Sequence, residues 1–266
     1  VSVPGTGVRV FLWDEVSKLG TNHYTAISQK ASTIDTVVKT SNELKLRYGS
    51  FDPLKAVLPV DSTLKANAGT SMYIVQFLSQ PLQEYRNAIQ GLGGEVANFL
   101  PDNAYVVEIS ADKVSDLKSL PFVRWVGALE PGWRLDESLI KGLKEGTLVE
   151  DNYYVQIAGD SVVRKNRVAV QIGLIGGQIV DCPQQGTLME VRIKPQFLSL
   201  VAAVDGVLFI DRKGEPEPDM DNVRIVNGAN YVQTNGNYQG QGTKMHVIDG
   251  GMRATCLLYT SDAADE

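Results

Sequence analysis

Metal ligands, disulfide partners and long apolar runs are all scarce in this sequence. The 266 residues include two cysteines and two histidines, which are too few to build a metal-binding cluster. No apolar run reaches the roughly 18 residues that a membrane-spanning helix needs. Lys and Arg number 25 against 31 Asp and Glu, and the resulting net charge of −6 disfavours binding to phosphate backbones. We therefore expect no metal, no cofactor, no nucleic-acid partner and no membrane span.

The middle of the chain contains an internal repeat. A length of 266 residues predicts about two compact domains. Residues 73–126 and 153–210 carry four sequence landmarks in the same order. These landmarks pair 73–77 with 153–157, 93–96 with 176–179, 108–109 with 190–191, and 122–126 with 206–210. The shared order predicts two copies of one structural unit.

Each copy has the pattern of strand, helix, hairpin, helix and strand. In the first copy, residues 73–77 alternate with the period of a strand. An amphipathic helix follows and ends at Gly93-Gly94, and residues 95–109 have the pattern of a hairpin around a Pro-Asp-Asn turn. A second helix and a strand at 123–126 complete the unit. The order β-α-β-β-α-β is that of the ferredoxin-like, or split βαβ, fold.

The predicted fold class is therefore α+β, with two tandem ferredoxin-like modules. Two helices cover one face of such a sheet, so the other face must pack against the second copy or another domain. The predicted division is 1–69 as an N-terminal segment of unassigned fold, 70–136 as the first module, 137–150 as a linker, 151–215 as the second module, 216–238 as a linker, 239–255 as the start of another domain, and 256–266 as a foreign tail. Within the N-terminal segment we expect a strand at 8–13 and a helix near 34–46.

A carboxylate stands at the end of the last predicted strand. A Gly-Gln-Gly turn at 240–242 precedes the apolar residues 245–248, and Asp249 then comes before Gly250-Gly251. Such an aspartate either caps the next turn or lies at the carboxyl edge of a parallel sheet, where functional sites gather.

Taken together, the tandem modules, the Pro-rich exit at 215–218 and Asp249 resemble a subtilisin-like serine peptidase (subtilase) precursor. In that family a ferredoxin-like propeptide precedes an α/β catalytic domain that opens with Gly-x-Gly and a strand ending in the catalytic Asp. The resemblance identifies Asp249 as the triad Asp, although Gly250 departs from the usual Thr or Ser. The triad His and Ser would follow beyond this fragment, because residues 256–266 resemble a translated sequencing adapter.

The resemblance implies the N-terminal fragment of a secreted endopeptidase, extracellular or on the cell surface. Its propeptide modules would help its own catalytic domain to fold and would inhibit it, with either exit, 129–136 or 212–221, in the substrate cleft. Polypeptides would be the substrates of the intact enzyme, and any calcium would belong to the missing catalytic domain. The fragment itself should be inactive.

Two other classes of protein stay open. One is a tandem ferredoxin-like module that binds a small ligand or a protein without catalysis, with polar residues facing the ligand between the copies. The other is a cell-surface adhesion or structural protein.

Four further residues could have either a functional or a purely structural role. Ser71, within Gly-Thr-Ser-Met, spells the start of the subtilase nucleophile motif, but it precedes Asp249 and leads into a strand, so we expect a loop residue. His23 and His246 are expected to be surface or packing residues. Without the foreign tail Cys182 is the only cysteine, and no internal disulfide is expected.

Overall fold

The computed structural model describes residues 1–18, 20–29, 33–214, 220–238, 240–242 and 244. The chain divides into two compact units, Val1–Gly214 and Glu215–Glu266. The first unit contains several antiparallel sheets with helices packed on them, which confirms the predicted α+β class. The described part of the second unit contains α6 (Met220–Val226) and α7 (Ala229–Gly236), in a stretch predicted as a linker.

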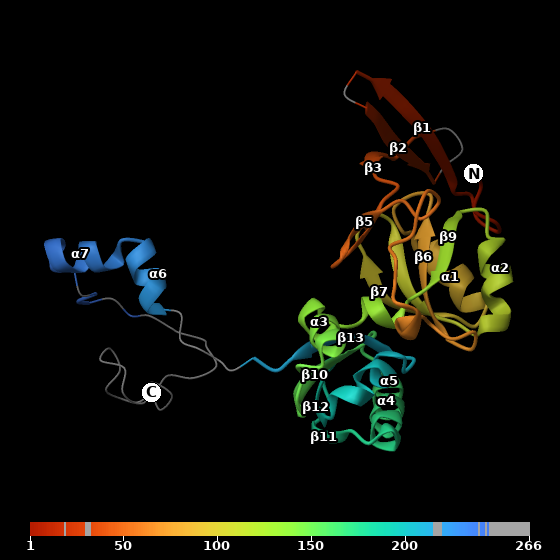
Figure 1. Ribbon diagram of the computed structural model, residues 1–266. Helices are drawn as coiled ribbons and strands as arrows, with labels where there is room; N and C mark the ends of the chain where they lie inside the picture. Colours follow the sequence, from red (N-terminus) through yellow and green to blue (C-terminus); the bar gives the residue numbers. More distant parts are fainter. Residues whose placement is uncertain (19, 30–32, 215–219, 239, 243, 245–266) are drawn as a thin grey trace. The chain divides into compact units, whose positions relative to one another are not determined.

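The N-terminal segment is a β structure (Figure 1). Strands β1 (Arg9–Ser17), β2 (Gly20–Ser28) and β3 (Thr36–Thr40) form an antiparallel sheet, and β4 (Leu44–Leu46) pairs with β5 (Gly49–Phe51). The helix predicted near 34–46 is therefore wrong. The β-branched run Thr36-Val37-Val38 has the side chains that favour a strand, and β3 pairs with β2, Val38 opposite Thr25.

The first repeat folds into a four-stranded antiparallel sheet with the order β7-β8-β6-β9. Its elements, in chain order, are β6 (Met72–Phe77), α1 (Gln83–Gly91), β7 (Glu95–Leu100), β8 (Ala104–Glu108), α2 (Val114–Lys118) and β9 (Val123–Ala128). Tyr85 and Ile89 of α1 and Leu117 of α2 are buried in one core with Val75 and Phe77 of the central strand β6. Both helices therefore cover the same face of the sheet.

The second repeat has the same element order and the sheet order β11-β12-β10-β13. Its elements are β10 (Asp151–Ile157), α4 (Val162–Ile175), β11 (Gln178–Asp181), β12 (Leu188–Ile193), α5 (Leu198–Ala202) and β13 (Val207–Arg212). The stretch predicted as the first linker contains α3 (Glu137–Glu145), whose Leu139 is buried in the second core. Short 3₁₀ turns lie at η1 (Ser62–Leu64), η2 (Ala111–Lys113), η3 (Pro131–Trp133) and η4 (Pro195–Phe197).

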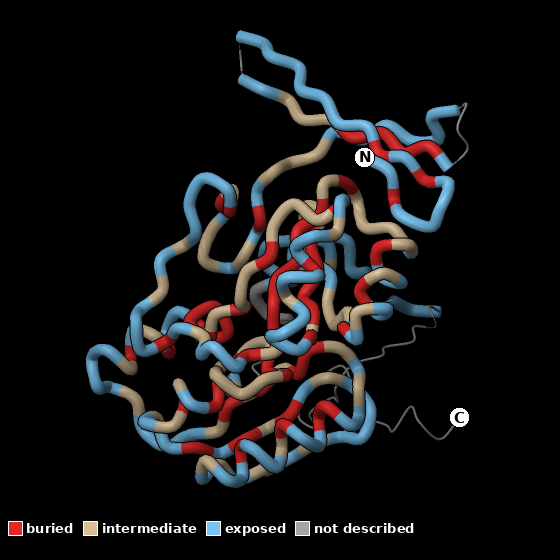
Figure 2. Tube along the Cα trace, turned by 90° about the vertical axis from the view of Figure 1, so that its right-hand side faces the viewer, coloured by how far each residue is buried: buried red, intermediate tan, exposed pale blue. Residues whose placement is uncertain are grey.

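The two sheets differ in how their faces are covered. Figure 2 shows how burial varies along the chain. All six residues of β6 are buried, because the face opposite the helices packs against the β4–β5 hairpin. Ile74 of β6, Leu44, Phe51 and Trp133 share this additional core. In β10 burial alternates along the strand, and only the side chains that face α4 and α5 are buried. The second sheet therefore has one face without an apolar core.

This difference predicts unequal effects of equivalent mutations. Ile74 and Tyr154 hold the same position in the two copies, but Ile74 is fully buried and Tyr154 is half-buried. Ile74→Ala should lower the free energy of unfolding by about 2–5 kcal/mol, because it leaves a cavity between sheet and hairpin. Tyr154→Ala should lower it by about 1 kcal/mol or less. Urea unfolding of the two variants measures both values, and equal losses would contradict the assignment of the faces.

Candidate functional site

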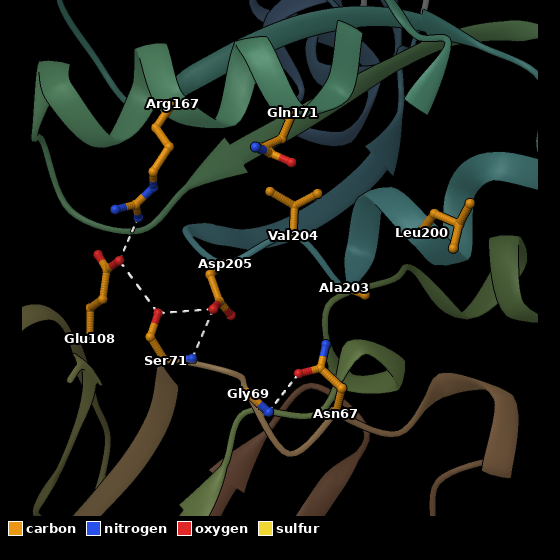
Figure 3. Close-up of a pocket in the computed structure, with 10 residues that line it drawn as sticks. All are labelled: Asn67, Gly69, Ser71, Glu108, Arg167, Gln171, Leu200, Ala203, Val204 and Asp205. Atoms are coloured by element: carbon orange, nitrogen blue, oxygen red, sulfur yellow. Dashed lines mark hydrogen bonds and ion pairs between the residues drawn. The ribbon is translucent and has the colours of Figure 1, made fainter. Parts of the chain in front are cut away.

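A polar cleft lies where the two repeats meet, with a volume of about 440 Å³. Asn67 and Ser71 come from the loop before β6, while Arg167 and Gln171 come from α4 on the opposite side (Figure 3). Gly69, Glu108, Leu200, Ala203, Val204 and Asp205 complete the lining. The cleft is therefore built from residues far apart in the sequence.

Asp205, in the turn between α5 and β13, holds the loop before β6. The Thr70 hydroxyl donates to Oδ1 at 2.8 Å, and the Ser71 backbone N–H donates to Oδ2 at 2.8 Å. The Ser71 hydroxyl donates to the same Oδ2 at 3.0 Å. Hydrogen bonds to an ionised acceptor are stronger than neutral ones. This carboxylate therefore joins the second repeat to the start of the first.

A second set of charges joins α4 to the first sheet. The Arg164 side chain is 2% exposed, and its Nε donates to Glu108 Oε2 at 2.6 Å. Its Nη1 donates to the Ala158 carbonyl at 2.7 Å, and its Nη2 lies 2.8 Å from Glu95 Oε2 in an ion pair without hydrogen-bond geometry. Arg167 pairs with the other oxygen of Glu108. Glu108, Arg164 and Arg167 thus each have a partner of opposite sign, whereas Asp205 is held by two hydroxyls and a backbone N–H.

The connector between the repeats contains another buried cation. Arg134 is fully buried, and its guanidinium donates to the Leu129 carbonyl and, at 3.1 Å, to the Val204 carbonyl. Burial lowers the pKa of Arg134 to about 10, while the negative charges of Asp205 and Glu130 act in the opposite direction. Arg134 therefore remains charged at neutral pH.

The same connector is also paired with a strand of the second sheet. The Ile210 N–H of β13 donates to the Arg134 carbonyl, and the Asp136 N–H donates to the Ile210 carbonyl. Leu135, between them, is fully buried and forms a parallel bridge with Ile210. The exit predicted at 129–136 is thus part of the packed interior.

The candidate functional residues from the sequence do not lie together in the described structure. Asp249 and His246 lie outside the described residues. His23, on β2, has its Nδ1 2.6 Å from Asp14 Oδ1 and does not line the cleft. Cys182 is a half-buried free thiol. Ser71 precedes β6, as predicted, but it also lines the cleft, which sequence reasoning missed.

The chemistry open to Ser71 is limited by its neighbours. Its hydroxyl donates to Asp205 and lies 3.5 Å from Glu108 Oε1. Among the described residues its side-chain partners are carboxylates, which differs from the serine–histidine pair of a hydrolase. The contact between Ser71 and Asp205 spans 134 positions, and no local pattern could have revealed it.

The described residues contain neither a metal-binding cluster nor a membrane-spanning helix. No group of three or more His, Cys, Asp or Glu side chains lies close enough to hold a metal ion there. In the same part of the chain, no helix combines the length and apolar character needed to span a bilayer.

Comparison with known proteins gives one match. Residues 45–130 match the family model of a domain of unknown function (DUF8729). The matched stretch includes most of the β4–β5 hairpin together with the first repeat, so it contains both the sheet and the segment that covers its second face. Neither the curated proteins nor the solved structures gave a match.

The role of Asp205 can be tested by unfolding. Asp205→Ala removes the acceptor of three hydrogen bonds between the repeats and should lower the free energy of unfolding by about 2–3 kcal/mol. Asp116→Ala is the matched control, because that carboxylate is exposed and pairs only with Lys113, and should cost less than about 0.5 kcal/mol. Similar values for the two variants would show that Asp205 does not join the repeats.

Proposed function

We propose that this chain is the N-terminal propeptide region of a secreted subtilisin-like serine endopeptidase, with two ferredoxin-like modules that assist and inhibit its catalytic domain. Two features support the modules: the β-α-β-β-α-β order occurs twice, and both sheets place their four strands in the same relative order. Asp249 would be the triad Asp of the catalytic domain, and the triad His and Ser would follow later in the chain.

The observation that carries the proposal is the face of the second sheet that has no apolar core of its own. The chain's own hairpin fills the equivalent face of the first sheet. On the second sheet that face presents Tyr154, Gln156 and Phe209, all half-buried, beside Leu188, which is 45% exposed. The Arg47 guanidinium, from the turn between β4 and β5, lies over the Phe209 ring at 5.0 Å from its centroid, so the face is covered in part and open around Leu188. A mixed aromatic, apolar and polar surface is suited to packing against a folded partner. We assign docking on the catalytic domain to the second module.

The two exits are also unequal. The stretch 129–136 could enter a substrate cleft only if Arg134 lost its buried contacts and Leu135 separated from β13. β13 ends at Arg212 and the compact first unit ends at Gly214, so the second exit lies at the border of that unit. We therefore assign the inhibitory segment to the exit that follows β13, which the second module also carries.

A direct test is to read the coding sequence beyond residue 255. The continued reading frame should encode a His-Gly-Thr-His segment and, later, Gly-Thr-Ser-Met-Ala, which supply the missing triad residues in the order Asp, His, Ser. A stop codon soon after residue 255 would end the proposal. Residues 256–266 should be absent from the native gene.

The inhibitory role needs an assay with the catalytic domain from that reading frame. The purified chain should slow its hydrolysis of a chromogenic peptide and show no hydrolysis itself. Leu188→Glu puts a charge on the proposed docking face and should weaken inhibition by about tenfold or more, since an unpaired charge resists burial. Val163→Glu is the control, because Val163 is 79% exposed on α4, at the covered face of the sheet. Unchanged inhibition by Leu188→Glu would contradict the assigned face.

A second candidate function is a ligand-binding module without catalysis. The cleft at Ser71 and Asp205 favours it, because polar side chains from both repeats line one cavity there.

A further inference from the structure

Strand β1 is the outer strand of the N-terminal sheet, and a short segment of the chain already pairs with its outer edge (Figure 1). The N–H and C=O groups of Val10 both bond to Val1 at 2.7 Å, so they point away from β2. The N–H of Val3 bonds in the same way to the Val8 carbonyl at 3.0 Å. This antiparallel ladder ends at Val10, whereas β1 continues to Ser17.

The rest of that edge is open to an added strand. Backbone groups alternate between the two sides of a strand, so those of Leu12, Asp14 and Val16 point outward, as those of Val10 do. No other strand of the described chain pairs with β1 on this side. Proteins commonly protect an edge with Pro, Lys or a bulge. The sequence of β1 contains neither residue, and its register against β2 is uninterrupted.

The side chains beside the open edge are apolar, aromatic or acidic. Leu12 and Val16 are exposed on one face of the sheet. On the other face the rings of Trp13 and Tyr24 are stacked, with centroids 5.5 Å apart and planes at 13°. Since Tyr24 belongs to β2 and covers the inner side of the indole, the other side of that ring is turned toward the open edge. Glu15 is exposed two positions further along the same face.

The charges of β1 determine which kind of strand fits this edge. An antiparallel second copy paired with the open stretch would place Asp14 opposite its own equivalent, and like charges directly opposite each other are destabilising. A basic side chain opposite Trp13 would instead lie on the free side of the indole, where a cation is attracted, and within reach of Glu15. Glu15 has no ion-pair partner among the described residues, whereas Asp14 pairs with His23. Charge therefore favours a basic strand from a different protein.

We propose that the outer edge of β1, from Leu12 to Val16, binds an extended basic peptide of another protein as an added antiparallel strand. The peptide continues the ladder that residues 1–3 begin, and it exchanges backbone hydrogen bonds with the three outward-facing residues. One basic side chain lies against Trp13 and a second lies opposite Glu15. Apolar residues alternate with these two and lie beside Leu12 and Val16. This inference does not depend on the propeptide role.

Fluorescence anisotropy of a labelled pentapeptide with the full chain tests this edge. The probe is fluorescein-labelled Val-Lys-Thr-Arg-Val with an amidated carboxyl end, and it should bind saturably. N-methylation of its Thr, whose N–H points at Asp14, should weaken binding about tenfold or more. N-methylation of its Arg is the matched control, because that N–H points away from β1 and its loss should leave binding unchanged. The same peptide with Glu in place of Lys and Arg should bind about tenfold more weakly.

Variants of the chain locate the peptide on β1. Glu15→Lys should weaken binding of the basic peptide about tenfold and strengthen binding of the Glu-substituted one, because it reverses the charge beside the edge. Glu145→Lys is the matched control, since Glu145 is exposed on α3 and the same reversal of charge there should change neither affinity. Trp13→Ala should weaken binding of the basic peptide several-fold, because it removes the aromatic ring.

Four results would overturn the proposal. Three are the absence of saturable binding, equal losses of affinity from the two N-methylations, and equal affinity for the basic and the Glu-substituted peptide. The fourth is a dimer of the chain alone, seen by analytical ultracentrifugation and disrupted by Val16→Asp, which would assign the edge to a second copy. If circular dichroism shows that a variant does not fold, the N-methylated peptides decide the outcome, because they need only the unaltered chain. Peptidase inhibition is a separate measurement, so failure of one proposal leaves the other intact.

Discussion

The structure of the first unit depends on a buried guanidinium in the connector between its two repeats. Arg134 is out of contact with water and is satisfied by backbone carbonyls, Leu129 on the side of the first repeat and Val204 on the side of the second. An unpaired buried charge is costly. Arg134 therefore stabilises only the arrangement of the two repeats in which both carbonyls accept its hydrogen bonds. Asp205 adds a negative charge and three hydrogen bonds at the same junction. Two small sheets thereby become one compact body.

The two sheets of this unit share one topology but differ in how far their faces are buried. The first sheet is buried on both faces, and its central strand has lost the alternation expected of a half-exposed strand. The second sheet keeps the alternation, and its other face has no apolar core and is covered only in part, where Arg47 lies over the Phe209 ring. A hairpin that precedes the first repeat causes the difference, since Leu44 and Phe51 fill the face that the helices leave uncovered. The match of 45–130 to one family model includes most of that hairpin.

Local patterns predicted local structure well. Alternation predicted β6 and β10, and the glycine pairs predicted the helix ends, where Gly93 and Gly176 have positive φ values of 82° and 102°. The helix expected near 34–46 failed because apolar spacing suits both helix and strand, and pairing with β2 decided between them. Helix α3 was missed, although Asp136 caps its first turn and Gly146 ends it. The cleft could not be predicted, because its contacts join residues more than a hundred positions apart.

The pairing of Leu135 with Ile210 has a consequence for association with other chains. An exposed sheet edge offers unpaired amides and carbonyls to any extended polypeptide. On the second sheet the connector occupies part of the outer edge of β13, so that border is closed to strand addition at its centre. Its opposite border is the four-residue strand β11, with an irregular register against β12. One edge of the sheet is thus partly paired with the connector of the same chain. The strand at the other edge is too short and irregular to act as a template for aggregation.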